Sequence, residues 1–213
     1  MEFQINKDTK IYGSFSNNPG NNGCIFFNDA FQQRGINSIY KSFYADNIEN
    51  VILATKTLGF AGFALSIPFK VEVLKYLDII DESANQIGAV NTVVNNNGIL
   101  TGYNTDFFGV VDFFSHRNIN GHINIIGNGG FSKAIQTVCK SMGIGYTVIL
   151  RNGVPNILKT EGLVYVNATP ANIEFGNNTF IDLRPTTPDG KLVAKYQATH
   201  QFKIYTGIDY ENS

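Results

Sequence analysis

One segment, residues 123–150, limits the possible folds of this chain more than any other. It contains an apolar run (INII), a glycine-rich turn at 127–130, a helix-like stretch and a second apolar run, YTVIL. A strand, a tight turn, a helix and a parallel strand within roughly 30 residues make up the βαβ unit of an open α/β sheet. The segment therefore predicts an α/β fold with mostly parallel strand pairing.

The composition fits a folded protein with a buried core and one or two domains. Of its 213 residues, 43% are hydrophobic, which rules out a disordered, fibrous or coiled-coil chain. The net charge is -1 and the basic residues are scattered, so neither nucleic acid nor a membrane surface is favoured as a partner. No apolar run reaches the ~18 residues of a membrane span, and the N-terminus is too polar for a secretory signal. We expect a cytoplasmic protein.

Cysteine and histidine residues are too few and too dispersed for a disulfide framework or a metal site. Cys24 and Cys139 do not have CxxC spacing. His116, His122 and His200 have no nearby Cys or His at a spacing that would bind a metal. The sequence therefore predicts a protein without a metal.

Alternation of apolar and polar residues divides the chain into strands and helices. Strands are expected at 10–16, 38–45, 60–67, 89–94, 99–106, 123–127, 146–152, 163–170 and 179–185. Helices are expected at 25–35, 47–59, 69–77, 107–119, 128–143 and 191–205. Asn97-Gly98 lies between two β-rich runs and predicts a hairpin turn.

The glycine-rich turn consists of Gly127, Asn128, Gly129 and Gly130, which follow an apolar strand and open a helix. Glycine permits a tight turn and lets a pyrophosphate approach the backbone, and the helix N-terminus supplies free N–H groups. Ser132 occupies the position of the third glycine, so the match to the dinucleotide fingerprint is imperfect. An ordinary strand-to-helix turn is the alternative, but the strand–turn–helix–strand context favours a dinucleotide site.

The end of the next strand bears on which dinucleotide would bind. It carries Arg151 and Asn152, and it lacks the acidic residue that an NAD site typically places there. A guanidinium can pair with a 2′-phosphate, which favours NADP. A solvated charge at the end of a strand is the ordinary alternative for Arg151.

Polar residues also interrupt or end the apolar runs of the first half. They are Ser14, Ser16, Ser66, Lys70, Asn91, Asn104, Thr105 and Asp106. Taken singly, each has an ordinary explanation, since serines cap turns, lysines are solvated, and Asn and Asp form Asx turns. However, ligands bind at the carboxyl ends of strands in α/β sheets, where most of these residues fall. A Lys and an Asp in one cleft could bind a substrate hydroxyl and manage its proton.

At these residues the sequence resembles the shikimate dehydrogenase family. The matching stretches are SIPFK (66–70), IGAVNTVV (87–94), GYNTDFFG (102–109), IIGNGGFSKA (125–134) and QATHQF (197–202). They occur in the family's order, cover nearly the whole chain and form a highly specific combination. The serine pair followed by an Asn/Gly-rich loop, at 14–23, is more similar to the shikimate dehydrogenase-like branch.

The resemblance implies a role for each candidate residue. The implied catalytic pair is Lys70 and Asp106. The implied substrate-binding residues are Ser14 and Ser16, which would hold the carboxylate, with Ser66, Asn91 and Gln197. The implied cofactor-binding residues are Gly127, Asn128, Gly129, Gly130, Arg151 and Asn152.

The resemblance also implies an architecture and a reaction. The expected domains are an α/β substrate domain at 1–105, which a C-terminal helix at 190–213 rejoins, and a reduced Rossmann-like NADP-binding domain at 106–189. The implied reaction is the reversible, NADP-dependent reduction of 3-dehydroshikimate to shikimate, in the biosynthesis of chorismate and the aromatic amino acids. Shikimate or 3-dehydroshikimate is the implied partner, and both a monomer and a homodimer stay open.

The cofactor half departs from the family's pattern by being short. The stretch between Arg151 and Val164 scarcely holds the usual helix, and Pro185 leads almost directly into the helix of Gln197, without the family's tyrosine-bearing strand end. Only one helix, at 130–142, is expected between residues 121 and 185, so one face of this sheet would be thinly covered.

Three alternatives to this function remain. The same chemistry could act on a related acid such as quinate. A methylene-tetrahydrofolate dehydrogenase-like enzyme is a second possibility, against which the NTD and QAxxQ motifs argue. A binding protein that has lost turnover is the third, and the presence of both Lys70 and Asp106 argues against it.

Overall fold

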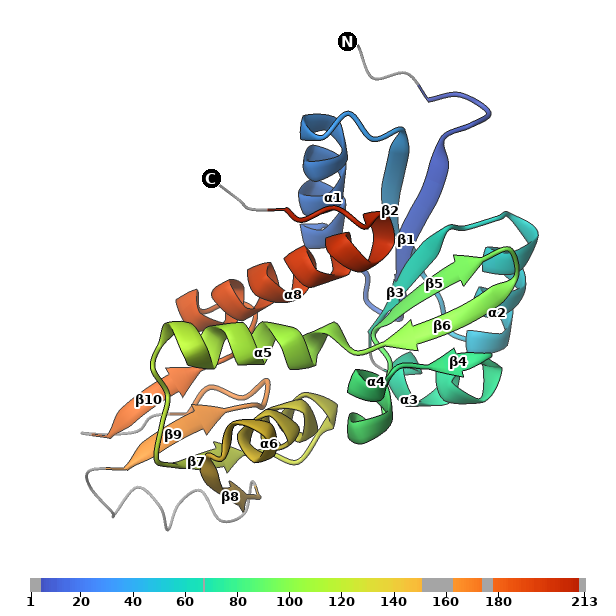
Figure 1. Cartoon of the computed structure of the whole chain (residues 1–213). Helices are drawn as coiled ribbons and strands as arrows, with labels where there is room; N and C mark the ends of the chain where they lie inside the picture. The colour runs from blue at the N-terminus through green and yellow to red at the C-terminus, as the bar shows by residue number, and fades with distance from the viewer. Residues whose placement is uncertain (1–4, 67, 151–162, 174–177, 211–213) are drawn as a thin grey trace. The chain divides into compact units, whose positions relative to one another are not determined.

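The computed structural model describes residues 5–66, 68–150, 163–173 and 178–210, which form two compact units (Figure 1). The first unit comprises Met1–Thr105 and Ala198–Ser213, and the second comprises Asp106–Gln197. Each unit has its own sheet and its own core, so the α/β class expected from the sequence is confirmed.

The sheet of the first unit has six strands in the order β2-β1-β3-β5-β6-β4. These strands are β1 (Lys10–Ser16), β2 (Ser38–Tyr44), β3 (Gly62–Leu65), β4 (Ile79–Ile80), β5 (Thr92–Asn96) and β6 (Ile99–Tyr103). β1 pairs in parallel with β2 and β3, whereas β5 pairs antiparallel with β3 and β6. The helices are α1 (Asn22–Gln33), α2 (Ile48–Thr57), α3 (Phe69–Glu72), the 3₁₀ helix η1 (Val73–Tyr76) and α4 (Glu82–Ile87).

Turn and cap residues explain where several of these elements begin and end. Asn97 and Gly98 adopt φ angles of 53° and 92°, the left-handed conformations that a two-residue hairpin between β5 and β6 requires. The Asn47 side chain accepts hydrogen bonds from the N–H groups of Glu49 and Asn50, which caps the first turn of α2. The hairpin turn predicted from the sequence is therefore confirmed.

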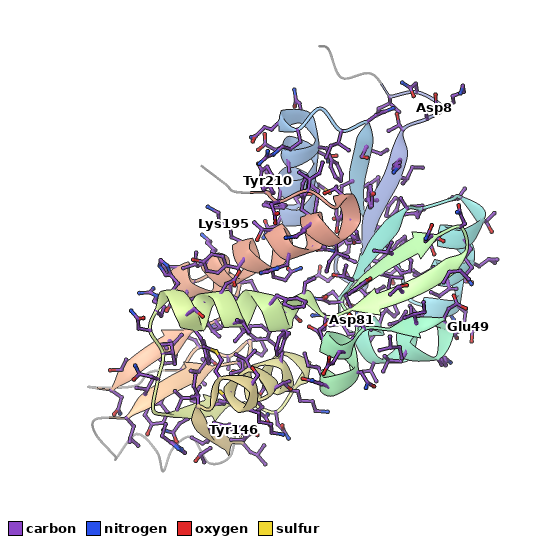
Figure 2. All side chains as sticks on the ribbon, in the orientation of Figure 1. Asp8, Glu49, Asp81, Tyr146, Lys195 and Tyr210 are labelled. Carbon is purple, nitrogen blue, oxygen red and sulfur yellow. The ribbon has the colours of Figure 1, made fainter. Side chains whose placement is uncertain are left out.

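The predicted elements differ from the structure mainly at 69–88. The single helix expected at 69–77 is a short α3 that continues as η1. The sequence prediction missed β4 and α4. Both residues of β4 are exposed, so no alternation of burial marks the strand. Asp81, labelled in Figure 2, caps α4 by accepting from the N–H of Ser83, a signal that could have located the helix.

The sheet of the second unit has four parallel strands in the order β10-β9-β7-β8. These strands are β7 (His122–Ile126), β8 (Gly145–Ile149), β9 (Val164–Asn167) and β10 (Thr179–Asp182). Its helices among the described residues are α5 (Thr105–His116), α6 (Gly130–Met142) and α8 (Pro188–Thr206). From β7 the chain moves to β8 on one side and then returns to β9 on the other. The strand order therefore reverses between β7 and β9, the position where open α/β sheets bind ligands.

The two faces of this sheet are covered differently. One face packs against side chains from three helices, represented by Phe113 of α5, Val138 of α6 and Val193 of α8, in one core. The opposite face carries a smaller cluster around Ile126 and Tyr165, which are 1% and 0% exposed. Among the described residues between 121 and 185, α6 is the one helix, as the sequence predicted; α5 and α8, from either side of that range in the chain, pack with it in the same core.

The C-terminal helix α8 spans Pro188–Thr206, close to the 191–205 expected from the residue pattern, but its assignment to one domain differs from the prediction. A helix at 190–213 was expected to belong wholly to the substrate domain, but the boundary between the units falls inside α8, after Gln197. Val193 explains this, because it packs in the core of the second unit. The helix ends at Thr206 because Gly207, with φ of 73°, takes the left-handed conformation that terminates helices.

Two features are absent from the described part of the chain. None of its helices is both long enough and apolar enough to cross a membrane. In the same residues, no group of three or more His, Cys, Asp or Glu side chains could hold a metal ion.

Candidate active site

The carboxyl end of β1 carries both predicted carboxylate-binding serines. Ser14 is half-buried and Ser16 is 8% exposed. The Ser14 hydroxyl donates to Ser42 Oγ, 3.0 Å away on the neighbouring strand β2, and Ser16 Oγ accepts from the N–H of Asn18 at 3.2 Å. The two hydroxyls therefore lie at the end of the strand where parallel sheets bind ligands.

A polar cluster that the sequence analysis did not find surrounds Ser14. Ser42 Oγ lies 3.3 Å from Cys24 Sγ in the first turn of α1, and the Ser42 N–H donates to the same sulfur at 3.2 Å. Tyr40, two residues before Ser42 on β2, also reaches Ser14: burial raises the pKa of its hydroxyl, and a hydrogen bond with Ser14 partly opposes that shift. No motif signals Ser42, although its place on the strand beside Ser14 follows from the parallel register.

Backbone hydrogen bonds bring the other predicted residues of the first unit to the same region. The N–H of Ser66 donates to the carbonyl of Phe15 at 3.2 Å, beside the end of β1. The N–H of Val90 donates to the carbonyl of Lys70 at 2.7 Å, which joins the first turn of α3 to the residue before Asn91. Ser66, Lys70 and Asn91 thus lie around the ends of β1 and β3.

Asn91 is buried and its side chain is held in one orientation. Its Oδ1 accepts hydrogen bonds from the Thr92 hydroxyl at 2.9 Å, from the Thr105 N–H at 2.8 Å and from the Thr105 hydroxyl at 3.1 Å. Asn104 supports this arrangement, because its Nδ2 donates to the carbonyl of Ala89 at 2.9 Å. The NTD motif therefore has a structural role: its Asn and Thr fix the segment that leads into Asp106.

Asp106 and Gln197 belong to the second unit. Asp106 lies in the first turn of α5, where a carboxylate is favoured by the helix dipole. One turn later, a Cβ built on Gly109 would lie 2.9 Å from both Cβ and N of Gln197, so the backbones of α5 and α8 approach closely there. Asp106 and Gly109 share a face of α5, so Gln197 packs next to the turn that carries Asp106. Lys70 belongs to the other unit, and its pairing with Asp106 stays a prediction.

The glycine-rich turn has the geometry of a phosphate-binding loop. Gly127 has φ of 102°, which glycine adopts readily, and a Cβ there would lie 2.7 Å from Cγ2 of Thr169. A Cβ built on Gly129 or Gly130 would meet no atom within 4 Å, so the backbone there is open. Ser132 is fully buried and its hydroxyl donates to the carbonyl of Gly127 at 2.7 Å, which closes the turn in place of a third glycine.

These features fit the phosphates of a dinucleotide. Helix α6 has 13 residues, and its N-cap is Gly129, which has no side chain that could cap the first turn. The open backbone at Gly130 and the positive end of the helix dipole are both available to an anion. Asn128, in the same turn, is exposed and its Oδ1 accepts from Gln136 at 3.2 Å. Arg151 and Asn152, the predicted 2′-phosphate end, lie outside the described residues.

Comparison with known proteins agrees with this arrangement. A sequence profile described as the shikimate dehydrogenase substrate binding domain matches residues 23–93. A shikimate dehydrogenase-like protein of Haemophilus influenzae is 37% identical over 169 residues, which are 77% of this chain and 62% of that protein. A shikimate dehydrogenase (NADP(+)) of Dehalococcoides mccartyi is 40% identical over 129 residues, 58% of this chain and 45% of that enzyme.

The solved structures support the same assignment. The structure of a shikimate 5-dehydrogenase-like protein superposes with a TM-score of 0.86 at 30% identity, covering 98% of this chain and 96% of that one. The sequence alignments, in contrast, span less than two thirds of the two curated relatives. The profile match, the aligned relatives and the shared fold together establish that this chain belongs to the shikimate dehydrogenase family.

Proposed function

We propose that this protein is an NADP-dependent dehydrogenase that interconverts 3-dehydroshikimate and shikimate, a step in aromatic amino-acid biosynthesis. The observation that carries the proposal is the gathering of Ser16, Ser66, Lys70 and Asn91 at one end of the first unit's sheet. A relative named shikimate dehydrogenase (NADP(+)) is 40% identical over 58% of this chain, which supports the same chemistry.

The substrate would be held mainly by side chains of the first unit. Ser16 would donate its hydroxyl to the carboxylate, and Ser14 would do the same by turning its single O–H from Ser42 to the ligand. Hydrogen bonds to an ionised group are the stronger kind. Ser66 and Asn91 supply further polar groups for the ring hydroxyls. Gln197 would add an amide from α8. A small acid bearing several hydroxyl groups is the class of substrate that such a set of donors and acceptors suits.

Proton transfer is the part of the reaction assigned to Lys70 and Asp106. When bound, the reduced cofactor supplies the hydride that adds to the ring carbonyl of 3-dehydroshikimate. Lys70 would donate the proton to the carbonyl oxygen as it becomes a hydroxyl, and Asp106 would hold that oxygen and the lysine in position. Transfer by a positioned side chain typically accelerates a reaction by ~10²–10⁴-fold.

The cofactor would be held by the second unit. Gly129 and Gly130 leave backbone open for the pyrophosphate at the N-terminus of α6, while Gly127 provides the tight turn. Arg151 would pair with the 2′-phosphate, which distinguishes NADP from NAD.

One assay tests the proposal against its alternatives. Reduction of NADP is followed by absorbance with shikimate, with quinate or with no acid, and binding of each ligand is measured by calorimetry. We expect turnover with shikimate above that with quinate, and none without an acid. Binding of NADP and shikimate without turnover would instead identify a binding protein, and turnover confined to quinate would change the substrate. The Haemophilus influenzae relative is named a shikimate dehydrogenase-like protein, and that name does not specify the acid. The comparison of shikimate with quinate is therefore the most informative part of this test.

A further inference from the structure

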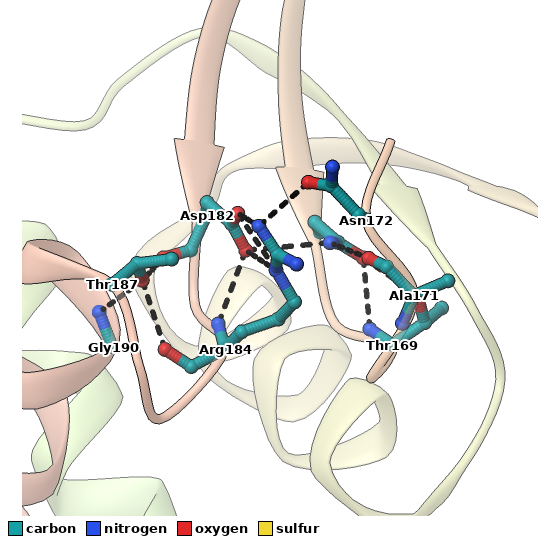
Figure 3. A network of polar contacts seen from close by, with 8 residues as sticks. Thr169, Ala171, Asn172, Asp182, Arg184, Thr187 and Gly190 are labelled. Carbon is teal, nitrogen blue, oxygen red and sulfur yellow. Dashed lines mark hydrogen bonds and ion pairs between the residues drawn. The ribbon is translucent and has the colours of Figure 1, made fainter. Parts of the chain in front are cut away.

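A second polar network, unrelated to the predicted motifs, lies at the carboxyl ends of β9 and β10 (Figure 3). The Arg184 Nε donates to both carboxylate oxygens of Asp182, at 3.0 and 2.9 Å, and its Nη2 donates to Oδ1 of Asn172 at 2.9 Å. The ion pair is well shielded, since the side chains of Arg184 and Asp182 are 21% and 14% exposed. The guanidinium therefore bridges the end of β10 and the loop that follows β9.

A buried asparagine extends this bridge into that loop. Asn167, at the end of β9, is 0% exposed. Its Oδ1 accepts from the N–H and the hydroxyl of Thr169, at 3.0 and 2.8 Å. Its Nδ2 donates to the carbonyl of Ala171 at 2.9 Å and to Oδ1 of Asp182 at 3.3 Å. Asp182 thus links Arg184 to Asn167, and together they fix the conformation of residues 168–172.

The loop fixed in this way lies against the glycine-rich turn. Cγ2 of Thr169 occupies the space where a Cβ on Gly127 would come within 2.7 Å. The N–H of Ala168 donates to the carbonyl of Ile126 at 3.1 Å, which ties the start of the loop to the end of β7. β7 and β9 are the strands between which the sheet order reverses. The loop therefore lies at the position where an open α/β sheet binds its ligand.

We propose that Arg184 is a positioning residue for the dinucleotide: through Asp182 and Asn172 it holds loop 168–172 against the glycine-rich turn. Arg184 acts through these neighbours and does not itself touch the cofactor. Ordering a flexible loop on binding costs conformational entropy. A loop that is already ordered before binding avoids this cost, so the affinity for the dinucleotide is higher. This inference rests on the proposed function, because it takes NADP as the ligand.

The test compares three variants of the whole chain. Arg184→Gln removes the charge, and Arg184→Lys keeps the charge but loses the fork that reaches Asp182 and Asn172 together. Arg117→Gln is the matched control, because Arg117 also pairs with an aspartate of this unit, Asp189, but is 49% exposed. Titration calorimetry gives the Kd of NADP and of shikimate, and amide exchange reports the order of residues 168–172 in the absence of ligand.

We expect the Kd of NADP to rise about tenfold in Arg184→Gln and severalfold in Arg184→Lys, with faster exchange at 168–172. The Kd of shikimate and the behaviour of Arg117→Gln should match the wild type. If Arg184→Gln does not fold, the lysine variant decides the question in the same way.

Three results would overturn the proposal. NADP binding at the wild-type level in a folded Arg184 variant would show that the bridge does not position the cofactor. Equal weakening of NADP and shikimate binding, with a lower melting temperature, would assign Arg184 a purely structural role. Absence of NADP binding by the wild type would refute the proposed function as well, and the wild-type titration alone reveals that case.

Discussion

The two units differ in the groups that they present to a ligand: the first presents side chains, and the second presents backbone at its glycine-rich turn. In the first unit, the groups at the strand ends are side chains, and they are already hydrogen-bonded to one another, as Ser14 is to Ser42 and Asn91 to Thr105. In the second unit, the end of β7 leads instead into open backbone at Gly129 and Gly130. Side chains discriminate between small molecules by their chemistry, whereas backbone amides at a helix N-terminus bind any phosphate. We infer that the first unit selects the acid and the second binds the dinucleotide.

The largest effect should come from the lysine of the first unit. Lys70→Ala is expected to lower the rate by ~10²-fold or more while binding of shikimate and NADP stays within about tenfold, because Lys70 acts mainly on the transition state. Steady-state kinetics and calorimetry measure the two quantities. Lys56→Ala, at an exposed position of α2, is the control. Turnover near the wild-type level would remove Lys70 from the mechanism.

Substitutions of Gly130 and Gly127 should distinguish the effect of blocking the cofactor from the effect of straining the backbone. Gly130→Val places a side chain in open space, so the fold should persist while the Kd of NADP rises about tenfold or more. Gly127→Ala forces φ of 102° on alanine and a contact with Thr169, which should cost roughly 1–3 kcal/mol of unfolding free energy as well as affinity. Melting temperatures and NADP titrations distinguish the two. Unchanged NADP binding in Gly130→Val would place the cofactor elsewhere.

Arg151→Ala tests the choice between the two dinucleotides. The Kd of NADP should rise about tenfold, as expected for the loss of a hydrogen bond to a charged group. The Kd of NAD should barely change, because NAD has no 2′-phosphate for a guanidinium to bind. An equal loss for both cofactors would mean that Arg151 supports the structure.

The smallest effects are expected among the hydroxyls of the first unit. Ser14→Ala should raise the Kd of shikimate about tenfold, because it removes a donor to a carboxylate. Ser42→Ala should change that Kd only about two- to fivefold, because Ser42 acts by orienting Ser14. Calorimetry with NADP provides the control, since its Kd should be unchanged in both. A larger effect for Ser42 than for Ser14 would show that Ser42 contacts the acid directly.

Local features made much of the fold predictable. The glycine-rich turn, the Asn97-Gly98 hairpin and the long amphipathic helices each follow from a few neighbouring residues, and the structure has them. The two-residue strand β4 and the break between α3 and η1 were missed, because their conformation depends on pairing with β6 and on packing more than on a local pattern.

The candidate site was less predictable, because contacts between distant residues carry no sequence signal. Ser42 and Cys24 reach Ser14 only through the parallel pairing of β1 with β2. Arg184 would be interpreted from sequence as an ordinary charge at a strand end. Only the register of β9 with β10, which places Asn167 opposite Asp182, reveals the bridge it forms.

Amide exchange with each ligand added separately tests most directly whether the first unit selects the acid and the second binds the dinucleotide. NADP alone should slow exchange at 127–133 and 168–172, and at a hundredfold excess over Kd should stabilise the second unit by roughly 2.7 kcal/mol. Shikimate alone should slow exchange at 13–18, 66–70 and 89–92. Without ligands, 122–149 should exchange faster than 10–16 and 38–44. Protection of 13–18, 66–70 and 89–92 by NADP alone, or of 127–133 and 168–172 by shikimate alone, would contradict the assignment of the acid to the first unit's strand ends and of the dinucleotide to the glycine-rich turn.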